Sequence, residues 1–243
     1  MTSAALATFT ALLLAHVLAD FVLQTGAMVR HKRHPGMLLL HGVIVLLTAQ
    51  AATGQIAARE LLVLAVAHVG IDAVKTWGGF DRIGGFLADQ GAHMLTLLAV
   101  ALYAPGLWES GIYAGQDWLL PAMALTSGAI IATIAGQYAV GLLMRPHGAR
   151  VRNNGLRDGG RLIGMLERGL IFVLIGLGQP LGVGFLVAAK SILRFGTATR
   201  DQRTAEYVII GTLASFGWAI LASYGTLALI HLLPPLEIAR PLP

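Results

Sequence analysis

Long apolar segments separated by short polar stretches dominate this sequence. The runs are unbroken, and most approach the roughly 20 apolar residues that a helix needs to cross a bilayer. Strands of a membrane barrel would instead alternate apolar and polar residues. The apolar segments lie near residues 4–24, 37–52, 60–77, 86–103, 119–144, 162–177, 181–195 and 205–233. The pattern therefore predicts an all-α polytopic membrane protein with eight transmembrane helices.

The distribution of charge predicts how these helices are oriented. The chain is 56% hydrophobic and only 12% charged, against about 25% charged in an ordinary soluble domain. Lys and Arg fall almost entirely in alternate connections, with Arg59 and Arg240 as exceptions. Because basic loops stay on the cytoplasmic side, both termini are expected outside an inner (cytoplasmic) membrane. This topology also explains the pI near 10.0, so no nucleic-acid partner is expected.

Several familiar chemistries lack their sequence signatures. The chain has no cysteine, which excludes disulfides and thiolate metal sites. It also contains no Walker motif, no G-x-S-x-G elbow and no H-E-x-x-H motif, the marks of P-loop NTPases, serine hydrolases and zincins.

Ionisable residues inside the apolar segments repeat at a fixed spacing. His16, Asp20 and His41 recur 52 residues later as His68, Asp72 and His93. Since both copies have the same orientation, the first half is predicted to be a parallel repeat of two helical hairpins. Asp89 has no carboxylate counterpart, because Met37 occupies the equivalent position. Charged groups in hydrocarbon are costly unless they pair, bind a metal or face water, so the cluster is a functional-site hypothesis.

The predicted topology brings these side chains to one depth near the cytoplasmic edge. Residues four apart share a helix face, so each helix can direct its pair inward. Nitrogen and oxygen ligands suit Zn, Mn or Fe, and the arrangement is similar in architecture to the di-metal centres of four-helix bundles. The predicted ligands of one or two such ions are His16, Asp20, His41, His68, Asp72, Asp89 and His93. Structural hydrogen bonding and a proton or ion path remain as alternatives.

The remaining charged residues in the spans have two interpretations each. Lys75 can neutralise Asp72, anchor at the interface, or bind a phosphate. In the second half, Glu167 with Lys190, or Glu206 with Arg194, can brace helices as charge pairs. Alternatively, Lys190 and Arg194 can form an anion-binding wall. The predicted domains are a His/Asp bundle (1–103), an outer loop (104–118) and a four-helix region (119–243) with a basic cytoplasmic loop (145–161).

Four short motifs carry a family resemblance. HVLADFVLQ (16–24), LLLHG (38–42), HVGIDAVK (68–75) and DQGAH (89–93) resemble a bacterial integral-membrane family known only as a domain of unknown function. The resemblance covers residues 10–100. Three later stretches, GRLIGMLERGLIF, AAKSILRF and EYVIIGT, are similar to an extension carried by part of that family. The resemblance implies a bacterial inner-membrane protein and supplies no activity.

The residues favour an intramembrane metal-dependent hydrolase acting on a lipid or lipid-linked phosphate at the cytoplasmic leaflet. A divalent ion would activate water, and Asp89 would act as general base. Either Lys75 or the pair Lys190 and Arg194 would hold the anionic headgroup. The alternatives are a divalent-metal or proton-coupled transporter and a non-catalytic metal or stress sensor or structural partner. Transporter sites tend to lie near the midplane, whereas these ligands lie near one edge, which favours chemistry from one side.

Overall fold

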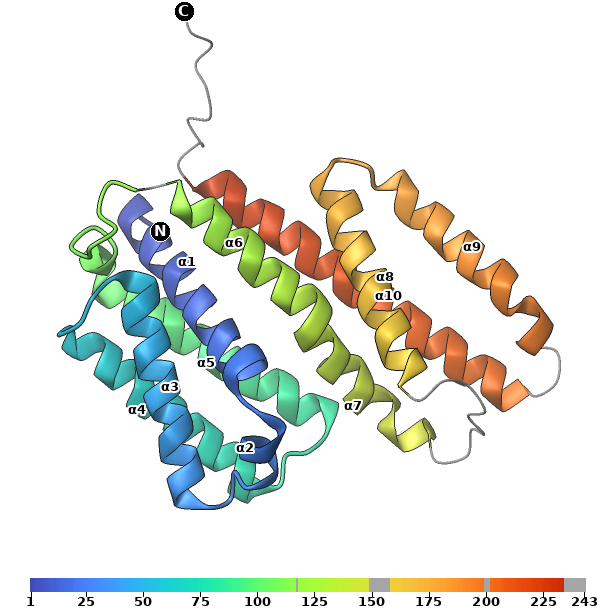
Figure 1. Ribbon diagram of the computed structural model, residues 1–243, viewed down its shortest axis with the longest axis horizontal. Helices are drawn as coiled ribbons and strands as arrows, with labels where there is room; N and C mark the ends of the chain where they lie inside the picture. The colour runs from blue at the N-terminus through green and yellow to red at the C-terminus, as the bar shows by residue number, and fades with distance from the viewer. Residues whose placement is uncertain (117, 149–157, 199–201, 234–243) are drawn as a thin grey trace, which may run out of the picture. The chain divides into compact units, whose positions relative to one another are not determined.

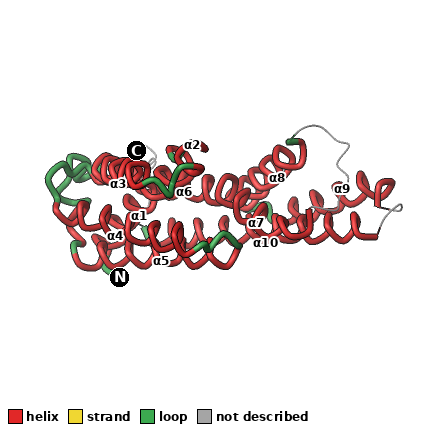
Figure 2. Tube along the Cα trace, turned by 90° about the horizontal axis from the view of Figure 1, so that it is seen from below, coloured by secondary structure: helices red, strands yellow, loops and turns green. Residues whose placement is uncertain are grey.

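Every regular element in the described part of the chain is a helix. The computed structural model describes residues 1–116, 118–148, 158–198 and 202–233 (Figure 1). Helices and connecting loops account for all of these residues (Figure 2). The prediction of an all-α fold is confirmed.

Six described helical segments are long and apolar enough to cross a membrane. They are Ser3–Leu23, Pro35–Thr53, Arg59–Gly78, Ile83–Tyr103, Leu119–His147 and Gln202–Leu232. These segments correspond to the first five predicted spans and the last. The predicted sixth and seventh spans fall on α8 (Gly159–Gly176) and α9 (Leu181–Ala198), which are not among the six. The helices thus indicate a membrane protein, while the number eight stays a prediction.

The chain divides into two compact units. The first contains Met1–Ser127 and the end of α10 from Ala228, and the second contains Gly128–Leu227. Each unit is described by itself below.

Four helices of the first unit form a closed ring. They are α1 (Ser3–Val17), α3 (Pro35–Thr53), α4 (Arg59–Gly78) and α5 (Ile83–Tyr103). Helix α1 packs against α3 and α5, and α4 packs against the same two helices. Figure 1 shows that α1 and α4 run toward the end of the bundle where the short α2 (Gly26–Arg30) lies, while α3 and α5 start there. Both hairpin connections therefore lie at one end.

Local sequence explains where these helices begin and end. Proline at the first position of α3 is pre-organised for a helix, and the His34 side chain accepts a hydrogen bond from the backbone N–H of Gly36. Helices α3 and α4 end at Gly54 and Gly79, both in the left-handed region with φ of 69°. Glycine adopts this conformation without steric cost, so it sets the length of both helices.

The opposite end of the ring is filled by apolar packing. Trp108, just after the 3₁₀ turn η2 (Pro105–Leu107), is 1% exposed and packs with Leu6, Ala11 and Leu120. The Thr8 hydroxyl donates to the carbonyl of Pro105 at 2.7 Å and accepts from the backbone N–H of Trp108 at 3.2 Å. The loop after α5 is thereby fastened to α1, and this end is closed by a buried tryptophan.

The second unit is organised around a π-helical turn. Helix α6 (Leu119–Ile130), whose last three residues belong to this unit, continues through η3 (Ile131–Ala135) into α7 (Gly136–Gly148). Arg168 of α8 donates from Nε and Nη2 to the Thr133 carbonyl at 3.2 and 3.0 Å. Trp218 of α10 (Gln202–Leu232) donates to the Ile131 carbonyl at 2.8 Å. Side chains from two other helices thus satisfy carbonyls that a π turn frees from regular α-helical bonding.

Candidate metal centre

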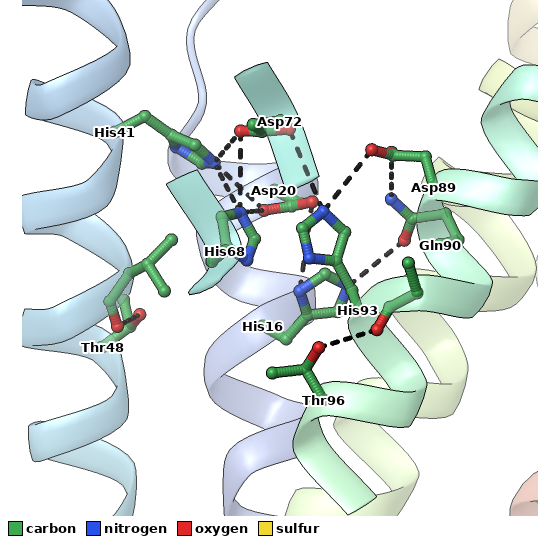
Figure 3. Close-up of polar contacts among 12 residues, drawn as sticks. His16, Asp20, His41, Thr48, His68, Asp72, Asp89, Gln90, His93 and Thr96 are labelled. Atoms are coloured by element: carbon green, nitrogen blue, oxygen red, sulfur yellow. Dashed lines mark hydrogen bonds and ion pairs between the residues drawn. The ribbon is translucent and has the colours of Figure 1, made fainter. Parts of the chain in front are cut away.

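The predicted ligands converge at the α2 end of the first unit. They come from all four helices of the ring and face one another (Figure 3). All four histidines, Asp72 and Asp89 are at most 5% exposed, and the Asp20 side chain is 9% exposed. Their side-chain atoms fall into three overlapping groups whose members lie within 4.8 Å of one another: His16 with His68 and His93, Asp20 with His41 and His68, and Asp72 with Asp89 and His93. These buried clusters can hold a metal ion.

The tightest group is a triangle formed by His41, His68 and Asp20. The two Nε2 atoms are 3.1 Å apart, and each lies 3.2 Å from Asp20 Oδ1. Bonds of about 2.0–2.1 Å around a tetrahedral zinc ion place neighbouring ligand atoms roughly 3.3 Å apart. The triangle therefore has the spacing of three ligands around one ion.

Protons alone cannot satisfy all three sides of this triangle. If both imidazoles donate to Asp20, two N–H groups face each other at 3.1 Å. If only one imidazole carries the proton, the lone pair of the other faces the carboxylate oxygen at 3.2 Å. A cation at the centre would be attracted to all three atoms, which favours a metal over structural hydrogen bonding.

Asp72 lies between the triangle and a looser group. Its Oδ2 lies 3.5 Å from His41 Nε2 and 3.7 Å from His68 Nε2, and its Oδ1 lies 3.9 Å from His93 Nε2. His93 Nε2 is also 3.6 Å from Asp89 Oδ1, and the His68 and His93 rings stack at 3.9 Å between centroids. Asp72 is placed to contact cations on both sides of its carboxylate.

Buried polar atoms of the cluster lack partners with hydrogen-bond geometry. Six of them belong to the predicted ligands: His16 Nδ1, Asp20 Oδ1, His41 Nδ1, Asp72 Oδ2, Asp89 Oδ1 and His93 Nε2. Roughly 90% or more of buried polar groups in proteins are hydrogen-bonded, and burying one without a partner costs free energy. Their concentration at one place is therefore typical of a site arranged around a cation.

Two lysines form ion pairs with carboxylates of the cluster. Lys32 Nζ lies 2.7 Å from Asp72 Oδ1, and Lys75 Nζ lies 2.6 Å from Asp89 Oδ2. Lys75 pairs with Asp89 across the α4–α5 hairpin and not with Asp72 on its own helix. The lysine side chains are 15% and 27% exposed, so they lie at the edge of the cluster and partly offset its negative charge.

Asp20 lies in a π-helical segment, which the four-residue spacing did not predict. The segment η1 (Leu18–Leu23) continues α1, and π turns are frequent at functional sites. Asp20 Oδ2 is 4.0 Å from His16 Nδ1, whereas Asp20 Oδ1 is 3.2 Å from both His41 and His68. Asp20 therefore contacts the neighbouring helices more closely than its own.

Two residues that contact the cluster were not singled out from the sequence. Lys32 belongs to the basic connection before α3, and Gln90 follows Asp89 within the DQGAH motif. The Gln90 side chain contacts His16 and Asp89 at 3.2 Å each. The position of Gln90 beside a candidate ligand was the available signal, whereas the path of the connection carrying Lys32 has no sequence signature.

The comparisons with known proteins concern this same segment. Residues 8–115 match the model of a family described as Protein of unknown function (DUF3307). This segment is a domain of unknown function. The match contains all seven candidate ligands and confirms the predicted resemblance to a domain of unknown function. No curated protein and no solved structure matches the chain.

The charge pairs predicted beyond the DUF3307 match involve residues of the second unit. Lys190 Nζ lies 2.6 Å from Glu167 Oε2 and 5.2 Å from the centroid of the Phe216 ring. Glu206 accepts a hydrogen bond from Gln202 at 2.9 Å. The side chain of Arg194 lies outside the described part of the chain. Glu167 and Lys190 therefore form the charge pair that braces α8 against α9.

Proposed function

We propose that the His/Asp cluster binds one or two divalent transition-metal ions, Zn, Mn or Fe. The triangle of Asp20, His41 and His68 is the first position, because its three ligand atoms have the spacing of a single coordination sphere. The looser group of Asp72, Asp89 and His93 is the second. A bound cation would neutralise the carboxylates and so offset the free-energy cost of burying their charge.

We further propose how the chain lies in the membrane. It has eight spans in a bacterial inner membrane, with both termini outside and the cluster at the cytoplasmic edge. The hairpins α1–α3 and α4–α5 form a parallel repeat within residues 1–103, followed by an outer loop (104–118) and a second membrane region (119–243). The alternating directions of α1, α3, α4 and α5 support this arrangement, as do the basic residues between α1 and α3.

The proposed activity is hydrolysis of a lipid or a lipid-linked phosphate at the cytoplasmic leaflet. Three protein ligands with an open fourth position are typical of catalytic zinc sites, and the metal would supply an activated water. With one ion bound at the triangle, Asp89 is the proposed general base, because Lys75 and Gln90 hold its Oδ2 while Oδ1 lacks a hydrogen-bond partner. Lys75 and Lys32 lie at the edge of the cluster, where ammonium groups would attract an anionic headgroup.

Packing at the far end of the ring favours one-sided chemistry over transport. A transporter needs a polar path from the other side, but Trp108 is buried there among alkyl side chains. The hydroxyls of Thr8, Thr10 and Thr48 each donate to a backbone carbonyl. Among the described residues, these hydroxyls are therefore already paired and supply no continuous polar path.

Metal content tests the first part of the proposal. The His41→Ala/His68→Ala variant removes two of the three ligands of the triangle, whereas His31→Ala/His147→Ala removes two exposed histidines. Elemental analysis of the purified proteins in detergent should show metal in the wild type and in the exposed-histidine control, and loss of it in the first variant. Equal metal in both folded variants would mean that the triangle is not the site.

Turnover and flux measured in parallel test the second part. Purified protein with a bacterial lipid extract should release a phosphate or acyl product only when metal is present. Asp89→Asn should lower kcat by about 10²–10⁴-fold, the usual contribution of a general base. If liposomes instead show metal flux that His68→Ala abolishes, with no lipid product, the protein is a transporter and the hydrolase proposal fails.

A further inference from the structure

Gln90 connects the Lys75–Asp89 ion pair to His16. Its Nε2 donates to Asp89 Oδ2 at 3.2 Å, and its Oε1 lies 3.2 Å from His16 Nε2 (Figure 3). The same Asp89 oxygen accepts from Lys75 Nζ at 2.6 Å. One amide therefore contacts two candidate metal ligands from different helices of the ring.

The ion pair fixes the orientation of this amide. A carboxylate paired with a lysine is ionised and can only accept hydrogen bonds. The side of Gln90 that faces Asp89 must then be the NH₂ group, which leaves the carbonyl oxygen facing His16. Reversing the amide would place two acceptors against each other at Asp89 and would forfeit that bond.

The orientation of Gln90 in turn selects the tautomer of His16. An amide oxygen accepts hydrogen bonds only, so His16 Nε2 must carry the proton. In a neutral imidazole, Nδ1 then presents a lone pair. This Nδ1 is buried without a hydrogen-bond partner, and the nearest carboxylate oxygen, Asp20 Oδ2, is 4.0 Å away. A second proton on the ring would gain no short hydrogen bond there.

We infer that Gln90 is a positioning residue that presents His16 Nδ1 to the metal centre as a ligand. This rests on the proposed metal binding. Because Gln90 occupies His16 Nε2, His16 enters the centre through Nδ1. His41 and His68 instead direct Nε2 at the triangle. Metal-ligating histidines almost always bond their second nitrogen to an acceptor that fixes tautomer and orientation, and Gln90 is that acceptor for His16.

Two measurements test this inference, and the first observes the wild-type protein. NMR of metal-free protein with ¹⁵N- and ¹³C-labelled histidine, assigned with His16→Ala, should show His16 protonated at Nε2. The second measurement compares Zn²⁺ affinity by chelator competition. Gln90→Leu should bind Zn²⁺ about 10–100-fold more weakly than the wild type, the usual effect of losing an outer-shell partner. Gln90→Glu keeps an acceptor for His16 and should retain the tautomer.

The matched control is Gln50→Leu, another glutamine in a helix of the ring. Gln50 donates to the Ile56 carbonyl at 2.6 Å and should leave both the tautomer and the affinity unchanged when replaced. His16 protonated at Nδ1, or equal affinities for Gln90→Leu and Gln50→Leu, would overturn the inference alone. A wild-type protein that binds no metal would overturn the proposed function together with it.

Discussion

Lys32 shows how much the centre depends on single side chains. Its ammonium contacts a carboxylate that is 1% exposed, and it reaches Asp72 from the connection between α2 and α3. Breaking one partner of a buried ion pair typically costs about 3–5 kcal/mol, because the other charge stays buried. Lys32 is partly exposed, so the cost here should lie toward the lower end of that range.

Lys32→Met should therefore lower the thermal stability of the metal-free protein more than Arg33→Met, which removes a charge from an exposed neighbour. Added Zn²⁺ should reduce the difference, since a cation beside Asp72 would replace the lost ammonium. Thermal unfolding in detergent, followed by circular dichroism with and without Zn²⁺, measures both effects. Identical midpoints for the two variants would show that the Lys32–Asp72 contact adds nothing to stability.

At the residue scale, the sequence predicted which side chains meet in the cluster but not all of the residues that pair with them. The 52-residue recurrence and the shared depth of the spans were enough to bring seven side chains together. The partners of the carboxylates were not predictable, because they depend on the path of a connection and on contacts across a hairpin. Lys75 lies one helical turn from Asp72 on α4, yet its side chain extends to α5 and pairs with Asp89.

Close approach of α3 and α4 is what brings His41 and His68 to 3.1 Å. Gly42 lies next to His41, and a Cβ added there would lie 2.5 Å from Val69 Cγ2 on α4. A β-branched side chain in a helix has little freedom to change rotamer. A larger residue at position 42 would therefore push the two helices apart at the metal centre.

Gly42→Ala should widen the triangle and weaken Zn²⁺ binding, with an overpacking cost to stability of about 1–3 kcal/mol. Gly70→Ala on α4 is the matched control, since a Cβ there meets nothing within 4 Å. Chelator competition and denaturant unfolding report the two quantities. If Gly42→Ala binds Zn²⁺ as tightly as Gly70→Ala, helix separation does not control the centre.

The sequence predicted where the helices lie far better than it predicted which turns are π-helical and which are α-helical. Apolar length and the glycines at 54 and 79 are local signals, and the described helices lie within a few residues of the predicted spans. The π turns η1 and η3 were not predictable, because one extra residue per turn leaves hydropathy unchanged. That extra residue turns Asp20 toward His41 and His68, so the distortion matters more to the site than the helix boundaries do.

Whether the chain crosses the membrane six or eight times depends on α8 and α9 of the second unit. Helix α8 carries Glu167 and Arg168, which reduce its apolar signal. The described apolar part of α9, Leu181–Ile192, is shorter than the six candidate spans. A reporter fused at Gly178, between α8 and α9, should report the outside if both helices cross and the inside if neither does. Fusions after residues 30 and 110 should report opposite sides. Residues 30 and 110 on one side would contradict the arrangement of the first unit as well.

Trp108 and the Thr8 hydroxyl beside it bear on whether protons could pass through the bundle. Four imidazoles and three carboxylates are good proton carriers, and a continuous chain of such groups would let a proton gradient leak away. The Thr8 hydroxyl is bound at both its donor and acceptor sides to the loop after α5, and the tryptophan beside it is almost fully enclosed. Under the proposed function, this end of the bundle would insulate the charged cluster electrically, so that its chemistry could take place in a membrane that holds a voltage.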